Sequence, residues 1–379
     1  MKKSKKIITR LLVMALTAGM IFAAGCSKKT DSTLVVTVND EKLTMQDMMY
    51  FIYALEAQGQ MYAQYYPTYW DMEYSEGVTM RDQMKTSVMD VAVMWEILYQ
   101  KSKDAGNTLT DEEKTNIETE VESIITSLKD DEERLKLTGF TKENLIKAQE
   151  KLQLADKYYQ TVLDSLEVKE DEIKAGIDKE TYRQYDTEYL YAATSKYNES
   201  YQLEELTDEE KAAAKDAIEQ ALKDVQAGKA FADIAKDNEA LTTTTLNFVK
   251  DDGTAEAEYQ EAAMKLKNDE VTDGIIETSK GYYIIKMTDN NSTESYDAAV
   301  TEAISNAKTE AFTDKYENEI KKEYTITVND KVWDTVVMGQ TTIPEAERIT
   351  STPTPEEATS TPEATATPEA TATPTESGK

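Results

Sequence analysis

Residues 281–287 read Gly-Tyr-Tyr-Ile-Ile-Lys-Met, a run rich in aromatic and β-branched residues in the second half of the chain. Aromatic and β-branched residues are typical of strands, so the stretch predicts a strand over Tyr282–Met287. Thr187–Ala192 and Thr245–Val249 predict two further strands for the same reason. The residues between these strands predict helices over about 207–228, 231–237 and 261–266. The sequence therefore predicts a small antiparallel sheet flanked by helices.

Outside this unit the pattern is helical. Apolar residues recur at helical spacing in four stretches, over about 80–98, 117–128, 148–166 and 300–311. Gly106 ends the first of these helices, and Thr110 and Glu113 form a capping box before the second. The sequence therefore predicts that helices make up most of the chain outside the sheet.

Thr37-Val38-Asn39-Asp40, near the start of the body, recurs near its end as Thr327-Val328-Asn329-Asp330. Each is a short β-prone run followed by an Asn-Asp turn signal. Pairing of these two ribbons would close the helical part of the chain on itself. The predicted fold class is α+β: a helical domain built from N- and C-terminal segments, an inserted unit with a small antiparallel sheet, and a disordered tail.

Composition excludes several classes of function. The chain has 379 residues, with 42 Lys+Arg, 73 Asp+Glu, no His and one Cys, and its net charge is −31. Without histidine there is no Ser-His-Asp triad and no histidine metal ligand, and one cysteine cannot form an internal disulfide. The negative charge repels phosphate backbones, which argues against nucleic acid as a partner. The acidic runs Asp111–Glu113 and Asp208–Glu210 lie at helix starts and predict caps, so no metal and no cofactor is predicted.

The N-terminal residues predict export. Basic residues precede an apolar run over Leu11–Ala24, which is too short to span a bilayer as a helix and is typical of a secretory signal. The run ends in Ala23-Ala24-Gly25-Cys26, which resembles the lipobox of bacterial lipoproteins. That resemblance implies cleavage before Cys26, a diacylglycerol on its sulfur, and anchoring at the extracytoplasmic face of the cell membrane. A plain secreted signal with an incidental cysteine is the alternative.

The C-terminal residues predict a disordered tail over 339–379. They are rich in Pro, Thr, Ala and Glu, and Pro-Glu-Ala-Thr-Ala-Thr occurs twice in tandem from Pro362. Such a composition buries too little apolar surface to offset chain entropy. We interpret the tail as a solvated spacer, with binding of cell-wall polymer as the alternative.

Several stretches, in order, resemble exported foldases of the PrsA/SurA type. Thr37–Thr44 is similar to the opening ribbon of that family, Gly106–Glu113 to a helix junction, and Val168–Ile173 to the approach to its isomerase domain. The resemblance covers nearly all of residues 33–330. It implies a helical chaperone domain that holds non-native polypeptides, with an inserted peptidyl-prolyl isomerase domain of the parvulin type.

The inserted unit resembles a parvulin domain at Gly228–Ala235, Tyr259–Leu266 and Gly281–Met287. Two histidines of that family are absent, because Tyr189 and Tyr283 stand at their positions. Prolyl isomerisation breaks no covalent bond, so an apolar slot with hydrogen-bond donors meets its basic requirement. Tyr189 and Tyr283 are therefore the candidate catalytic residues, with plain core packing as the alternative. The resemblance also implies a proline pocket lined by Leu246, Phe248, Tyr259 and Met264.

Methionine and tyrosine are concentrated early in the body. Gln60–Tyr74 breaks helical periodicity around Pro67 and predicts an exposed loop. Met and Tyr adapt to varied apolar partners, as promiscuous binding surfaces require. We therefore predict client-binding residues in this loop, with packing in the helical core as the alternative: Met61, Tyr62, Tyr65, Tyr66, Tyr69 and Trp70.

The predicted function is that of a membrane-anchored extracytoplasmic folding factor that binds unfolded or partly folded secreted polypeptides. Its parvulin-like domain is expected to be weak or inactive, and an active peptidyl-prolyl isomerase is the alternative. A non-catalytic surface spacer or adhesin is the third possibility. The oligomeric state is left open.

The predicted division is a signal peptide over 1–25, an anchor linker over 26–32, an N-terminal helical chaperone domain over 33–181, a parvulin-like domain over 182–290, a helix and strand completing the chaperone domain over 291–338, and the tail over 339–379.

Overall fold

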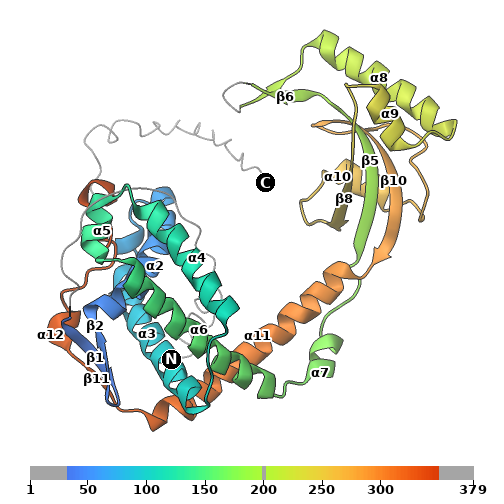
Figure 1. Cartoon of the computed structure of the whole chain (residues 1–379). Coiled ribbons are helices and arrows are strands. Elements are labelled where there is room, and N and C mark those ends of the chain that lie inside the picture. Colours follow the sequence, from blue (N-terminus) through green and yellow to red (C-terminus); the bar gives the residue numbers. More distant parts are fainter. Residues whose placement is uncertain (1–31, 199–201, 350–379) are drawn as a thin grey trace, which may run out of the picture. The chain divides into compact units, whose positions relative to one another are not determined.

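The computed structural model describes residues 32–198 and 202–349 (Figure 1). These residues fold into two compact units. The sheet unit is Leu166–Phe312, and the helical unit comprises the described residues on either side of it. The predicted signal peptide, Cys26 and the chain beyond residue 349 lie outside the described residues, so their roles stay predictions.

Five helices form the bulk of the described helical unit: α2 (Met45–Tyr65), α3 (Met80–Asp104), α4 (Asp111–Leu128), α5 (Glu132–Thr138) and α6 (Lys142–Ser165). The predicted helix over 80–98 is α3, and α6 packs along it. The predicted apolar stripe of α3 includes Met80, which is only partly buried. Its other members are buried, which confirms the stripe from there on: Met84, Val88, Val91, Trp95 and Leu98. All eight residues from Val91 to Leu98 are buried, so α3 is the central helix of this unit.

Capping boxes begin α2, α3 and α4, where Thr44, Thr79 and Thr110 each accept a hydrogen bond from the backbone N–H three residues later. Among the described residues, no helix combines the length and the apolar character that crossing a membrane requires. Shorter elements complete the helical unit: η1 (Tyr69–Asp71), β3 (Glu73–Ser75), β4 (Val78–Thr79), η2 (Ile320–Glu323), α12 (Asp330–Trp333) and η3 (Glu345–Glu347).

The two Asn-Asp ribbons pair as predicted. β1 (Leu34–Val38) pairs with β2 (Glu41–Thr44) and with β11 (Ile326–Val328), both in antiparallel register. Asn39 donates its backbone N–H to the Thr325 carbonyl, and its side-chain oxygen accepts the Thr325 N–H, both at 2.8 Å. The helical unit is therefore built from the two ends of the described chain, as the sequence predicts.

Residues 336–349, here called the C-terminal strap, fold onto the helical unit. Glu56 of α2 is fully buried, and its carboxylate accepts the backbone N–H groups of Gln340, Thr341 and Thr342 at 2.6 to 3.0 Å. The prediction of disorder from residue 339 onward is therefore wrong for residues 339–349. The strap is ordered because a side chain far away in the sequence satisfies its backbone donors.

The sheet unit is built on four strands in the order β8 (Thr242–Val249), β5 (Gln184–Ala193), β10 (Gly281–Ser292) and β9 (Ile276–Glu277). Every neighbouring pair is antiparallel, which confirms the predicted sheet. β10 contains the predicted strand over Tyr282–Met287, and it lies between β5 and β9 in the sheet.

Helices cover both faces of this sheet (Figure 1). α8 (Asp208–Gln226) and α9 (Phe231–Asp237) pack on one face through a cluster that includes Leu190 and Ile284. α10 (Ala257–Ala263) packs on the other face through a cluster that includes Tyr185 and Ile285. The unit also contains α7 (Glu170–Ala175), the hairpin of β6 (Ser195–Tyr197) and β7 (Leu203–Glu205), and most of α11 (Glu294–Asn318).

Candidate functional site

The candidate site lies on the face of the sheet that α10 covers. Thr187, Tyr189 and Tyr191 of β5 share this face, because successive side chains of a strand point to opposite sides. β10 contributes Tyr283, which lies opposite Tyr191 in the register, and α10 contributes Tyr259. We call Tyr189, Tyr191, Tyr259 and Tyr283 the tyrosine cluster.

The rings of the tyrosine cluster pack against one another. The centroid of the Tyr283 ring lies 5.2 Å from that of Tyr259 and 5.4 Å from that of Tyr189, both edge to face. The Tyr189 and Tyr259 rings are 5.8 Å apart in the same geometry. Tyr191 approaches Tyr283 most closely, at 4.7 Å and a tilt of 32°. Each such contact contributes about 0.5–1.5 kcal/mol beyond its burial, so the cluster stabilises the sheet unit.

Hydrogen bonds engage three of the four hydroxyl groups. Tyr259 lies 2.7 Å from the hydroxyl of Thr187, which in turn donates to the Leu246 carbonyl at 2.6 Å. Tyr191 donates to the Lys280 carbonyl at 2.7 Å and is also hydrogen-bonded to Tyr283. The hydroxyl of Tyr189 makes no hydrogen bond with another described residue. Tyr189 is therefore the member of the cluster with a donor to offer a ligand.

Burial raises the pKa of Tyr283 and of Tyr259 above the usual value for tyrosine, and negative charge on the neighbouring tyrosines raises it further. Burial also raises the pKa of Tyr189. These hydroxyl groups therefore stay protonated at neutral pH and act as hydrogen-bond donors. A histidine at the same position would titrate near pH 6.5 and could exchange its proton there.

The structure brings the predicted proline-pocket residues into the same cluster. Leu246 and Met264 are partly buried and pack beside Tyr189 and Tyr283. Phe248 and Tyr259 are 2% and 1% exposed, so they can form only the floor of a pocket. Their predicted roles in binding proline, and the catalytic roles predicted for Tyr189 and Tyr283, stay predictions.

Residues 198–289 match a family model described as rotamase, the PPIC-type PPIase domain. This segment is a PPIC-type PPIase domain. The predicted resemblance to PrsA-type foldases with a parvulin domain is confirmed. β5, which carries Tyr189, precedes the matched segment, whereas Tyr283 lies inside it.

The foldase protein PrsA of Lacticaseibacillus paracasei is 35% identical over 77 residues, which are 19% of this chain and 26% of that protein. The match thus spans about a quarter of the relative. PrsA of Streptococcus pneumoniae is similar at 17% identity, with 72% of this chain and 99% of that chain covered and a TM-score of 0.30. A solved structure from work on the SurA-like chaperones PEB4 and Cj1289 of Campylobacter jejuni is similar at 12% identity. The match covers 78% of this chain and 98% of that chain, with a TM-score of 0.31. Both scores are below 0.5, so the domain assignment rests on the family match and the sheet topology.

The predicted client-binding residues divide into exposed and buried groups. Four of them lie exposed at the C-terminal end of α2, and with the exposed Met72 they form what we call the aromatic patch: Met61, Tyr62, Tyr65, Tyr66 and Met72. Tyr65 is the most exposed of these, at 81%. Residues 60–65 continue α2, so the predicted loop begins only after Tyr65.

Trp70 and Tyr69 do not belong to an exposed surface, and that part of the prediction is wrong. Trp70 is 2% exposed because its ring packs against two glycines, where an added Cβ would approach it to 2.2 Å at Gly59 and 2.7 Å at Gly339. The guanidinium of Arg81 lies 5.8 Å from the Trp70 ring centroid. Tyr69 stacks on Tyr62 at 5.4 Å. These two side chains anchor the turn after α2 and support the aromatic patch from below.

Reasoning from the sequence missed two members of the site. Tyr191 and Thr187 lie two residues on either side of Tyr189, and the alternation of a strand places all three on one face. The predicted strand over Thr187–Ala192 already implied this alternation, so Thr187 and Tyr191 could have been identified from it. The buried Glu56 carried no comparable signal, because its partners are backbone groups of the strap.

Proposed function

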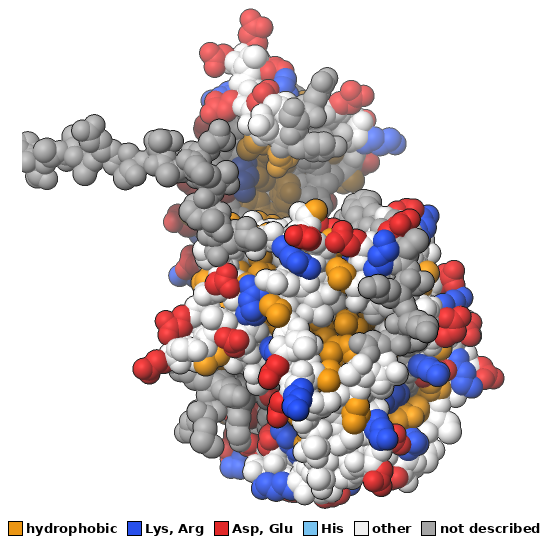
Figure 2. Space-filling view, turned by 90° about the vertical axis from the view of Figure 1, so that its left-hand side faces the viewer, with side chains coloured by type: hydrophobic (Ala, Val, Ile, Leu, Met, Phe, Trp, Pro, Cys, Tyr) orange, Lys and Arg blue, Asp and Glu red, His pale blue; other side chains and the backbone are white. Residues whose placement is uncertain are grey.

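We propose that this chain is a membrane-anchored extracytoplasmic folding factor that binds non-native secreted polypeptides and whose PPIC-type domain has little or no isomerase activity. The helical unit is the chaperone domain in this proposal, and the strap belongs to it. The observation that carries the proposal is the aromatic patch, which exposes flexible and aromatic side chains on a rigid helix end. Figure 2 shows hydrophobic side chains gathered near the middle of the visible face of the helical unit, with charged side chains around them.

We predict that replacing Met61, Tyr65 and Tyr66 together by serine abolishes most of the suppression of client aggregation. Each of these side chains is at least 60% exposed, whereas Tyr62 stacks on Tyr69 and is left in place. The measurement is light scattering from a reduced, aggregating client at stoichiometric amounts of the protein. Tyr197→Ser is the matched control, because Tyr197 is 71% exposed on the hairpin of the sheet unit. Equal suppression by the triple variant and the control would contradict the role of the patch.

An active isomerase is the second candidate, because residues 198–289 match the PPIC-type domain and Tyr189 offers a hydrogen-bond donor. We expect no acceleration of a proline-limited refolding reaction at catalytic amounts of the full chain. The hydroxyls of Tyr191 and Tyr259 are already engaged in hydrogen bonds, and the rings of Tyr259 and Tyr283 pack against each other. Acceleration that is lost in Tyr189→Phe, and that is constant between pH 6 and 9, would establish the isomerase instead. The constancy follows from the raised pKa of the cluster tyrosines.

Anchoring and export are supported by the N-terminal sequence alone. The basic start, the apolar run over Leu11–Ala24 and the lipobox-like Ala23-Ala24-Gly25-Cys26 favour a lipid on Cys26 and a place at the extracytoplasmic membrane face. The Pro/Thr/Glu-rich residues beyond 349 then act as a spacer. Nothing in residues 32–198 and 202–349 favours the third possibility, a non-catalytic spacer or adhesin.

A further inference from the structure

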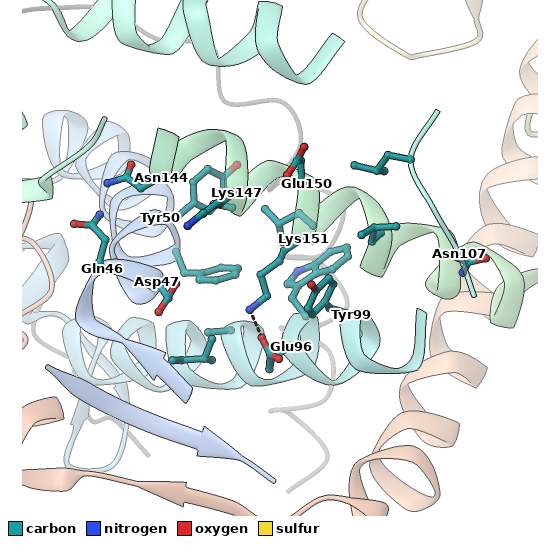
Figure 3. A pocket seen from close by; sticks show the side chains of 18 of the residues that line it. Gln46, Asp47, Tyr50, Glu96, Tyr99, Asn107, Asn144, Lys147, Glu150 and Lys151 are labelled. Atoms are coloured by element: carbon teal, nitrogen blue, oxygen red, sulfur yellow. Dashed lines mark hydrogen bonds and ion pairs between the residues drawn. The ribbon is translucent and has the colours of Figure 1, made fainter. Parts of the chain in front are cut away.

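A cavity of about 620 Å³ opens in the helical unit between α2, α3 and α6 (Figure 3). α6 packs closely along α3, whereas α2 approaches α6 much less. α3 therefore forms the bottom of the gap between α2 and α6. The volume lies within the range of sites that hold small organic ligands. None of the predictions from the sequence assigned a role to this cavity, and the aromatic patch contributes no residue to its lining.

Apolar and aromatic side chains make up half of the residues that line the cavity. Aromatic side chains come from two helices, with Tyr50 and Phe51 on α2 and Trp95 and Tyr99 on α3. Aliphatic side chains complete the wall: Leu43, Leu109, Ala148, Leu152 and Leu154. Flat rings supply a large contact area at a small cost in side-chain entropy. The cavity is therefore shaped for apolar groups.

The charges inside the cavity compensate one another. The carboxylate of Glu96 is 1% exposed and pairs with the ammonium of Lys151, which also lies 5.0 Å from the Tyr99 ring centroid (Figure 3). Gln100 donates a second hydrogen bond to Glu96 at 3.0 Å. This buried carboxylate is therefore already satisfied and needs no charged ligand to neutralise it.

Uncommitted polar groups lie on the α6 side of the cavity. Lys147 and Glu150 line it, and neither forms a hydrogen bond or ion pair with another described residue (Figure 3). They have opposite charges, so this side is balanced as well. A polypeptide presents carbonyl oxygens and N–H groups together, and these suit a lysine and a glutamate placed one helical turn apart.

We propose that this cavity binds a bulky apolar side chain, of the leucine or phenylalanine class, from an uncharged segment of a client polypeptide. The side chain enters between Phe51, Trp95 and Leu152, and the adjoining backbone meets Lys147 and Glu150. The inference rests on the proposed function, because it takes the occupant to be a client. It adds to the aromatic patch an enclosed site that selects single side chains by size and polarity.

The first test locates binding at Trp95. The three tryptophans of the full chain are labelled with 5-fluorotryptophan, and their ¹⁹F resonances are assigned with Trp95→Phe. Titration with N-acetyl-Phe-Leu-amide is expected to shift the Trp95 resonance alone, with a dissociation constant on the order of 0.1–1 mM. N-acetyl-Asp-Gln-amide, the polar probe, is expected to leave all three unchanged. A silent Trp95 resonance, or equal shifts with both probes, would overturn the proposal.

The second test fills the cavity. Ala148→Leu adds apolar volume to the lining and is expected to weaken binding of N-acetyl-Phe-Leu-amide about tenfold or more. Thr161→Leu introduces the same side chain at an exposed position of α6, and it is expected to bind like the unmodified chain. Unchanged affinity in a folded Ala148→Leu variant would refute the site. If that variant does not fold, Lys147→Ala and Glu150→Ala, which lie at the surface, are expected to weaken binding twofold to fivefold.

Failure of this inference differs from failure of the proposed function. A chain that suppresses client aggregation while its Trp95 resonance stays silent keeps the proposed function and loses the cavity site. If the chain binds the apolar probe at Trp95 yet suppresses no aggregation, the cavity site is supported and the proposal that its occupant is a client is contradicted. Titration with octanoate tests whether an acyl chain occupies the cavity instead. A shift of the Trp95 resonance larger than that caused by the peptide probe would assign the cavity to acyl chains and contradict the proposal.

Discussion

Replacing Glu56 by alanine is expected to lower the free energy of unfolding of the helical unit by about 4 kcal/mol. Few single substitutions cost this much. The expected loss is large because one carboxylate binds three successive backbone N–H groups of the strap, and also the hydroxyl of Thr342. Glu56 is fully buried, so no water replaces the missing acceptor without rearrangement.

The effect extends beyond these four hydrogen bonds. The strap brings Gly339 against the ring of Trp70 and buries Met338 and Ile343. Arg81, whose guanidinium lies over the Trp70 ring, also bonds to the Met338 carbonyl and so attaches the strap beside Trp70. Release of the strap would therefore expose apolar surface as well as unpaired donors.

Tryptophan fluorescence during urea unfolding measures this loss directly. All three tryptophans, Trp70, Trp95 and Trp333, lie in the helical unit, so their transition reports on that unit and not on the sheet unit. Gln64→Ala, at an exposed position of the same helix, is the control and is expected to change the free energy by less than about 0.5 kcal/mol. Glu56→Gln keeps one acceptor oxygen, so its loss in free energy of unfolding is expected to lie between those of Glu56→Ala and Gln64→Ala. A loss below about 1 kcal/mol in Glu56→Ala would show that the strap contributes little.

The second large effect is expected in the sheet unit, where Gly281→Ala should cost about 3 kcal/mol. A Cβ at this position would lie 2.3 Å from the carbonyl oxygen of Ala192 and 2.6 Å from the Cε2 of Tyr191. The oxygen belongs to the neighbouring strand β5, which is fixed between β10 and β8, so it cannot move aside without breaking the register. The collision also displaces Tyr191, whose ring packs on Tyr283.

Near-ultraviolet circular dichroism during thermal unfolding follows this change, and the fluorescence of the three tryptophans identifies the transition of the helical unit. Gly274→Ala is the matched control, because an added Cβ there meets nothing within 4 Å in the same unit. We expect a lower midpoint for the sheet unit in Gly281→Ala, with the tryptophan transition of the helical unit unchanged. Equal midpoints for the two alanine variants would mean that the strand accommodates the methyl group.

Much of the fold could be predicted because its signals are local. The strand over Tyr282–Met287, the stripe of α3 and the capping box at Thr110 each depend on neighbouring residues within a few positions. The repeated Asn-Asp ribbon is a longer-range signal, and it was readable because both copies have the same sequence. Pairing of β1 with β11 confirms it.

The candidate site was predicted less completely. Tyr189 and Tyr283 were found from a resemblance, and the register of β5 with β10 and β8 then brings them together with Tyr191 and Tyr259. The exposure of the segment after α2 was predicted from Pro67 and from its composition. That reasoning could not separate the exposed Tyr65 from the buried Trp70, because both lie in one polar, aromatic stretch.

The amino-acid sequence was enough to predict the main helices and strands, their order and the lack of histidine chemistry, since these follow from residue type and spacing along the chain. The folded structure was needed to show which residues far apart in the sequence come into contact and which polar groups become buried. The strap is the clearest instance: Gly, Thr and Gln are typical of a linker, and the same residues become ordered where Glu56 meets their N–H groups. The cavity beside Trp95 is another, because it depends on how far α2 stands from α6. Backbone N–H donors are the same in every residue other than proline, and no local pattern of residues encodes a cavity. The ordered strap and the cavity could therefore not be predicted from the sequence.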